Sequence, residues 1–143
     1  MTGRPRILFV CTANAARSQM AEGYLRAKYG DRYEVFSAGF RPAGRVSSRA
    51  IQVMQEIGID ISGHQPKPLE TFAGVTLDIA VTLCDNAHAV CPVVPSAKRT
   101  IHHGFSDPHL TPGTDAEILD GYRRVRDAIC AWIDANFAHG LPQ

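Results

Sequence analysis

A cysteine, an arginine and a serine stand within eight residues of one another near the start of the chain, as Cys11, Arg17 and Ser18. The residues between the first two are small or polar, namely Thr12, Ala13, Asn14, Ala15 and Ala16. A guanidinium can donate paired hydrogen bonds to two oxygens of a tetrahedral oxyanion. A sulfur near a guanidinium, a hydroxyl and backbone N–H groups favours the nucleophilic thiolate over the thiol. The spacing therefore predicts a loop that binds an oxyanion and directs a thiolate at its central atom.

The elements on either side of this loop would place it at a helix N-terminus. The apolar run Ile7–Val10 is typical of a strand buried on both faces, and a helical pattern starts at Ser18. The first N–H groups of a helix lack partners and lie at the positive end of its dipole, where anions bind. The alternative is a buried cysteine that merely ends a core strand.

Strand and helix patterns alternate along the rest of the chain. The expected strands are Ile7–Val10, Tyr33–Ser37, Leu77–Leu83 and Ala97–His103. The expected helices are Ser18–Tyr29, Arg45–Ile57 and Asp115–Phe137, with one helical turn at Leu69–Phe72 and with Arg123, Arg124 and Arg126 on a solvated face of the last helix. This order predicts an α/β fold, with one domain over residues 1–143 and an open, parallel four-stranded sheet that carries helices on both faces.

A second cysteine, Cys84, ends the third expected strand as Cys11 ends the first. Ligands of such sheets bind at the carboxyl ends of the strands. If the two strands are neighbours, both sulfurs come to one crevice.

The composition is that of a globular protein, with 45% hydrophobic residues among 143 and a net charge of +1. This balance gives no indication of binding to nucleic acid or to a membrane. No apolar run is long enough for a membrane span or a signal peptide, so we expect a cytoplasmic protein. In that compartment, four cysteines favour catalytic, redox or metal roles over structural disulfides.

The segment CTANAARSQMAEG resembles the phosphate-binding loop of low-molecular-weight protein tyrosine phosphatases and of the arsenate reductases that share their fold. Further along the chain, the motifs VTLC, Cys-Pro and GF-x-DP follow in that order and resemble the thioredoxin-coupled arsenate reductases. The resemblance therefore covers nearly the whole chain. It implies that Cys11 is the nucleophile, Cys84 the second thiol and Cys91 the resolving thiol. It further implies that residues 11–17 bind the oxyanion, Ser18 stabilises the thiolate, Asn14 braces the loop and Asp107 is the general acid.

The implied reaction is a two-electron reduction of arsenate. Cys11 attacks arsenate with loss of water, and Cys84 then attacks the sulfur of Cys11 so that arsenite departs. Cys91 attacks Cys84, and thioredoxin reduces the Cys84–Cys91 disulfide. If residues 85–90 are helical, these two cysteines lie about 10 Å apart along the axis. A disulfide needs Cα atoms within roughly 4.4–6.8 Å, so we expect this segment to be the mobile element.

Other interpretations remain open at this stage. Cys84 and Cys91 could be core residues, an incidental redox pair on a phosphatase, or zinc ligands with nearby histidines, although Cys-x6-Cys is not a usual zinc spacing. Asp107 could simply start a turn. The whole protein could be a low-molecular-weight protein tyrosine phosphatase or a non-enzymatic thiol sensor of arsenite or a soft metal. Cys130 matches no family function and is assigned to packing.

Some relatives bind a potassium ion beside the loop through Asn, Glu, Ser and Asp. Asn14, Glu22 and Ser37 match, but Lys67 takes the position of the aspartate, and its ammonium could occupy the place of the cation. We therefore expect no bound potassium and no other cofactor. Ala13 stands where relatives often carry glycine, so we expect ordinary dihedral angles there.

Overall fold

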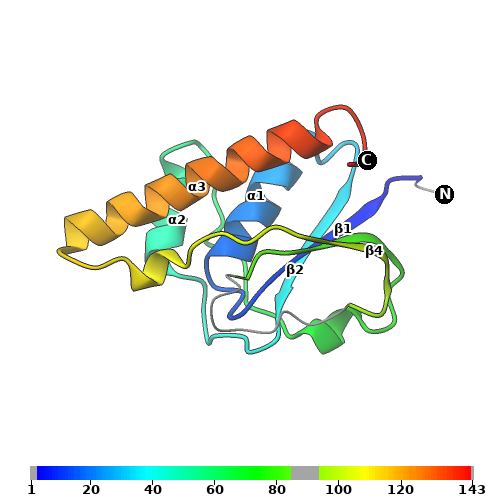
Figure 1. Cartoon of the computed structure of the whole chain (residues 1–143), viewed down its shortest axis with the longest axis horizontal. Coiled ribbons are helices and arrows are strands. Elements are labelled where there is room, and N and C mark those ends of the chain that lie inside the picture. The colour runs from blue at the N-terminus through cyan, green and yellow to red at the C-terminus, as the bar shows by residue number, and fades with distance from the viewer. Residues whose placement is uncertain (1–2, 85–93, 143) are drawn as a thin grey trace.

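Four strands form one parallel sheet in the order β2-β1-β3-β4 (Figure 1). The computed structural model describes residues 3–84 and 94–142. The strands are β1 (Arg6–Cys11), β2 (Glu34–Gly39), β3 (Leu77–Thr82) and β4 (Ala97–His102). The predicted parallel four-stranded sheet is confirmed, and β1 lies between β2 and β3.

Helices cover both faces of the sheet, as predicted, but unequally. The helices are α1 (Arg17–Tyr29), α2 (Ser48–Gln55), α3 (Asp115–Phe137) and the short 3-10 helices η1 (Leu69–Phe72) and η2 (Pro108–Leu110). The three α-helices pack together on one face, while η1 lies against the other (Figure 1). None of the helices in the described part of the chain is long and apolar enough to cross a membrane.

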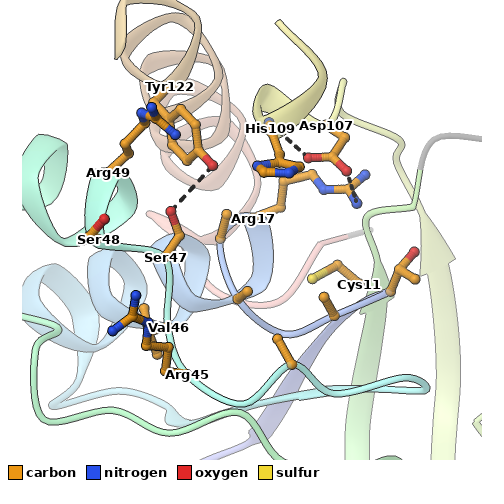
Figure 2. Close-up of a pocket in the computed structure, with 15 residues that line it drawn as sticks. Cys11, Arg17, Arg45, Val46, Ser47, Ser48, Arg49, Asp107, His109 and Tyr122 are labelled. Atoms are coloured by element: carbon orange, nitrogen blue, oxygen red, sulfur yellow. Dashed lines mark hydrogen bonds and ion pairs between the residues drawn. The ribbon is translucent and has the colours of Figure 1, made fainter. Parts of the chain in front are cut away.

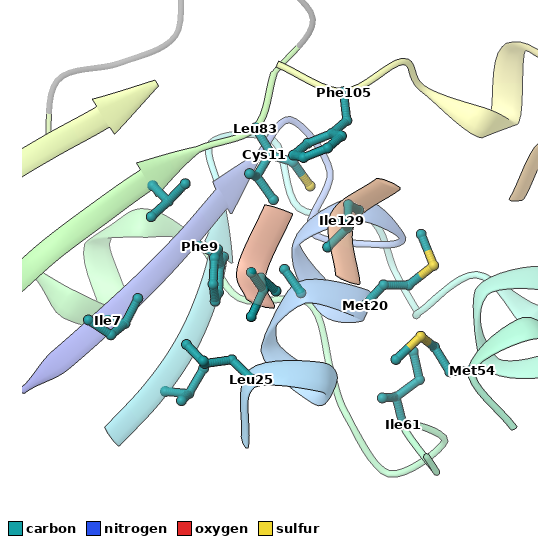
Figure 3. Packing of buried hydrophobic residues seen from close by; sticks show 14 of the residues in the cluster. Ile7, Phe9, Cys11, Met20, Leu25, Met54, Ile61, Leu83, Phe105 and Ile129 are labelled. Carbon is teal, nitrogen blue, oxygen red and sulfur yellow. The ribbon is translucent and has the colours of Figure 1, made fainter. Parts of the chain in front are cut away.

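The side chains of β1 alternate between two apolar clusters. Ile7, Phe9 and Cys11 pack in the larger cluster beneath the α-helices (Figure 3). Leu8 and Val10 face the smaller cluster beneath η1. Both faces of β1 are therefore buried, which explains its continuous apolar run.

Helix α2 is shorter at both ends than the predicted Arg45–Ile57, and Ser47, one of the two serines expected to mark its start, is its N-cap. The Ser47 hydroxyl accepts a hydrogen bond from Ala50 N–H at 3.3 Å. The Ser47 N–H in turn donates to the carbonyl of Ala15 at 2.8 Å. This bond ties the start of α2 to the loop after β1, and residues 45–47 line that loop instead of extending the helix.

The prediction that Arg126 lies on a solvated face is wrong. Arg126 is buried, and its Nη1 donates to the carbonyl of Val53 and to Oε1 of Glu56, both at 2.8 Å. Packing of α2 against α3 closes over this side chain, and Glu56 supplies the charge that compensates it.

Candidate functional site

The loop between Cys11 and Arg17 lies at the carboxyl end of β1, where the strand order reverses between β1 and β3. Ligands of open α/β sheets bind at such a switch point. The β1–β3 ladder pairs Val10 with Thr82, and Leu83 N–H donates to the Val10 carbonyl at 2.7 Å. Cys11 thus ends β1 and Cys84 follows the adjacent strand β3, which confirms the expectation that the two strands are neighbours.

A cavity of about 480 Å³ opens in front of this loop (Figure 2). Its lining residues are Cys11, Thr12, Ala13, Ala15, Ala16, Arg17, Ala43, Arg45, Val46, Ser47, Ser48, Arg49, Asp107, His109 and Tyr122. The volume suits a small-molecule site, and three arginines against one aspartate give it a positive balance. The cavity can therefore attract and hold an anion next to the Cys11 sulfur.

A buried hydrogen-bond network supports the loop from behind. The Cys11 sulfur lies 2.9 Å from the hydroxyl of Ser18. Asn14 Nδ2 donates to Ser18 Oγ at 2.7 Å and to Ser37 Oγ at 2.9 Å. Within the described residues, Asn14 is the one non-glycine residue with positive φ, at 51°. Asparagine tolerates this left-handed conformation better than most residues, so the turn falls on Asn14 while Ala13 keeps ordinary angles, as predicted.

The Arg17 guanidinium is buried at the edge of the cavity. Its Nη1 donates to the Phe105 carbonyl at 3.1 Å, and its Nη2 lies 3.8 Å from Oδ2 of Asp107 (Figure 2). Oδ1 of Asp107 accepts from His109 N–H at 3.0 Å and caps η2. The structure thus brings the arginine, the aspartate and the cysteine to one cavity. There the carboxyl of Asp107 can protonate a leaving group as a general acid.

The second thiol, Cys84, is fully buried at the end of β3. Leu83, its neighbour, packs in the same apolar cluster as Cys11. Cys91 and the segment predicted to move lie outside the described residues.

Asn14, Ser37 and Glu22, the three side chains that match the potassium site expected from the resemblance, lie together and are joined by hydrogen bonds. Arg26 Nη2 bonds Oε2 of Glu22 at 2.6 Å, and Ser37 donates to Oε1 of Glu22 at 2.6 Å. Oδ1 of Asn14 already accepts from Gln19 Nε2 and from the Lys67 N–H. These oxygens thus accept hydrogen bonds from within the protein, and Arg26 balances the charge of Glu22.

The role expected for the Lys67 ammonium is corrected by the same contacts. Its Nζ donates to the carbonyl of Gln65 at 2.9 Å, whereas Arg26 supplies the positive charge beside Glu22. Arg26 lies one helical turn after Glu22 on α1, so the pairing follows from i, i+4 spacing.

The cavity wall opposite the loop was not identified from the sequence. Ser48 and Arg49 come from the start of α2, Arg45 from the segment just before it, and Tyr122 from α3. Ser47 Oγ donates to Tyr122 Oη at 3.3 Å across these elements (Figure 2). Sequence patterns assign Tyr122 to the core, where it does pack, and only helix packing shows that it also reaches the cavity.

Cys130 lies on α3 away from the cavity. Burial, together with Asp127, raises the pKa of its thiol to about 12, which disfavours the thiolate at neutral pH. In the part of the chain that the structure describes, no cluster of three His, Cys, Asp or Glu side chains could hold a metal ion.

Fold and site together define a cysteine-containing α/β protein that binds tetrahedral oxyanions at a loop between a strand and a helix. The family model described as low molecular weight phosphotyrosine protein phosphatase matches residues 6–136. The chain belongs to this family.

Its curated relatives include proteins named arsenate reductase. The sequence is 46% identical to the one from Halalkalibacterium halodurans, over 86% of this chain and 88% of the relative. It is 44% identical to arsenate reductase 1 of Staphylococcus epidermidis, over 93% and 95% of the two chains. It is 40% identical to the protein from Bacillus subtilis, over 86% and 88%.

Solved structures agree with this relationship. An arsenate reductase in the phosphate binding state is similar with a TM-score of 0.77 and 30% identity, over 92% of this chain and 95% of that one. A low molecular weight protein tyrosine phosphatase from T. tengcongensis gives a TM-score of 0.70 and 28% identity, over 91% and 95%.

Proposed function

We propose that this protein reduces arsenate to arsenite in the cytoplasm, with electrons from thioredoxin. The observation that carries the proposal is the position of two cysteines after adjacent parallel strands, one of them inside an oxyanion loop. A phosphatase has no use for the second thiol, whereas a two-electron reduction requires it. The names of the relatives support the same reaction class.

In the first step, the Cys11 thiolate attacks arsenic(V) and displaces water, with Asp107 as the acid for the departing oxygen. Arg17 and the N–H groups of residues 12–17 hold the oxyanion, and Ser18 donates to the Cys11 sulfur until it reacts.

In the second step, the Cys84 thiolate attacks the Cys11 sulfur. The sulfur–arsenic bond breaks and its electron pair stays on arsenic, which leaves as arsenite. Two thiols have then lost two electrons to form the Cys11–Cys84 disulfide. Cys91 attacks Cys84 and releases Cys11 as a thiolate, and the thioredoxin dithiol reduces the Cys84–Cys91 disulfide.

Serine substitutions of the single cysteines test this relay. In an assay with thioredoxin, its reductase and NADPH, Cys84→Ser should show no arsenate turnover. Cys91→Ser should stop after one turnover and accumulate the Cys11–Cys84 disulfide, which peptide mass spectrometry detects. The matched control is Cys130→Ser, which should turn over arsenate like the wild type because Cys130 lies outside the cavity. Wild-type turnover by Cys84→Ser would refute the relay.

Phosphomonoester hydrolysis is a second candidate activity, because Cys11, Arg17 and Asp107 line one cavity and the family contains phosphatases. Both serine variants should then keep any hydrolysis of p-nitrophenyl phosphate. A thiol sensor, in contrast, would show no turnover in any variant and weaker arsenite binding in Cys84→Ser.

A further inference from the structure

Phe105 connects Arg17 of the oxyanion loop to the end of β3 through two hydrogen bonds, one on each of its backbone polar groups. It lies between β4 and η2 and is 8% exposed. Its side chain gathers with those of Cys11 and Leu83 beside the carboxyl end of β1 (Figure 3). Its backbone groups point to two different parts of the site.

The Phe105 carbonyl accepts a buried hydrogen bond from Nη1 of Arg17 at 3.1 Å. Arg17 is also the side chain that the oxyanion would engage. A hydrogen bond to a doubly charged oxyanion is stronger than one to a neutral carbonyl, so a bound oxyanion competes with Phe105 for the guanidinium.

The Phe105 N–H donates to the carbonyl of Leu83 at 3.1 Å. That carbonyl belongs to the peptide unit that joins Leu83 to Cys84. Because a peptide unit is planar and rigid, the bond fixes the backbone of Cys84 directly. Two hydrogen bonds through a single residue therefore connect Arg17 with the backbone of the second thiol.

An aromatic cluster holds Phe105 in this position. Its ring lies 4.7 Å from that of His103 and 6.4 Å from that of Trp132. His103 and Trp132 are themselves 5.2 Å apart. These ring contacts hold the side chain of Phe105, whereas the hydrogen bond from Arg17 holds its carbonyl.

We propose that Phe105 is a positioning residue that links occupancy of the oxyanion site to the freedom of Cys84. With the site empty, Arg17 holds Phe105, and Phe105 holds the Leu83–Cys84 peptide in its buried position. An oxyanion draws the guanidinium away, and the backbone of residues 83 and 84 becomes free to bring Cys84 toward Cys11. This inference rests on the proposed relay, for which the movement of Cys84 must follow arsenate binding.

Alkylation of Cys84 tests the link without any reduction of arsenate. Inorganic phosphate is used as the probe because it binds as an oxyanion but cannot be reduced. Saturating phosphate should raise the rate at which iodoacetamide modifies Cys84 about fivefold or more over the rate without phosphate. Peptide mass spectrometry identifies the modified Cys84 peptide, and general stabilisation by the bound anion would slow this modification rather than raise it.

In Phe105→Ala, phosphate should leave the rate at Cys84 unchanged, while Phe105→Tyr should restore the wild-type response. Phe72→Ala removes a buried ring from the opposite face of the sheet and should keep the response. If Phe105→Ala does not fold, Trp132→Leu removes one support of the ring and should reduce the response at least twofold.

A wild-type rate at Cys84 that phosphate does not raise, or a full response in Phe105→Ala or Trp132→Leu, would overturn the inference. Failure of the relay itself would appear separately, as absent turnover with an intact phosphate response.

Discussion

The hydroxyl of Ser18 lies 2.9 Å from the sulfur of Cys11, and both groups are buried at the N-terminus of α1. Asn14 donates to the oxygen of the same hydroxyl, so the hydroxyl hydrogen of Ser18 is left to point at the sulfur. This arrangement directs a hydrogen-bond donor at the Cys11 sulfur beside the cavity.

Ser18→Ala should therefore slow alkylation of Cys11 by iodoacetamide at pH 7 about tenfold, because a hydrogen bond to a charged group contributes about 1.5–3 kcal/mol. The measurement is the modification rate of the Cys11 peptide. Ser48→Ala is the control, since Ser48 lines the same cavity from α2 and should leave the rate unchanged. Equal rates in wild type and Ser18→Ala would contradict this role for the hydroxyl.

Gly39 pairs with Cys11 in the β1–β2 ladder and touches the backbone of the loop. A Cβ at this position would lie 2.7 Å from the Thr12 carbonyl oxygen and 2.8 Å from the Asn14 nitrogen. Gly39→Ala should displace the loop and weaken phosphate binding about 100-fold, the scale expected for a small misplacement in a site. Titration calorimetry measures the affinity. The control is Gly44→Ala, because a Cβ at Gly44 has no neighbouring atom within 4 Å, and this variant should bind phosphate normally. Unchanged phosphate affinity in Gly39→Ala would mean that the loop accommodates the methyl group.

Arg45 and Arg49 add positive charge to the cavity wall beyond the loop. The double variant Arg45→Ala/Arg49→Ala should raise KM for arsenate roughly threefold to tenfold at low salt, with kcat little changed, because the two charges assist capture of the anion. The difference should shrink as ionic strength rises, since salt screens exposed charges. Lys98→Ala, on β4, is the charge control and should not alter KM. A salt-independent effect would point to direct contact with the substrate instead.

Glu56 joins α2 to α3 through Arg123 and Arg126. The hydrogen bond from Arg123, followed by that from Arg126, lowers the pKa of Glu56 from 4.5 to about 2, against the opposing effect of burial. Since the pKa is lower in the folded state, this stabilisation is present above about pH 4.5 and is lost as pH falls toward 2.

Glu56→Gln should accordingly lower the urea midpoint of unfolding at pH 7, and the gap to wild type should narrow between pH 5 and about pH 3. Glu70→Gln is a suitable control, because Glu70 lies on η1 away from this ion pair. A gap that stays constant with pH would show that the effect of Glu56 does not depend on its charge.

Much of the site could be predicted from the sequence because its central part is continuous in the chain. Residues 11–18 supply the sulfur, the guanidinium and the hydroxyl, and the apolar run before them and the helical pattern after them fix the turn. Helix α3 was predicted with its observed bounds, since its apolar spacing and its capping box are local signals.

Tertiary structure alone decided the contacts between distant segments. The Phe105 carbonyl meets Arg17 across 88 positions, Arg126 meets Glu56 across 70, and Tyr122 joins the wall of the cavity. Such contacts depend on which strands pair and how helices pack, while periodicity reports only whether a residue faces inward. For the same reason, sequence patterns place Cys11 and Cys84 only at the ends of two strands, and the pairing of β1 with β3 is what makes those ends adjacent.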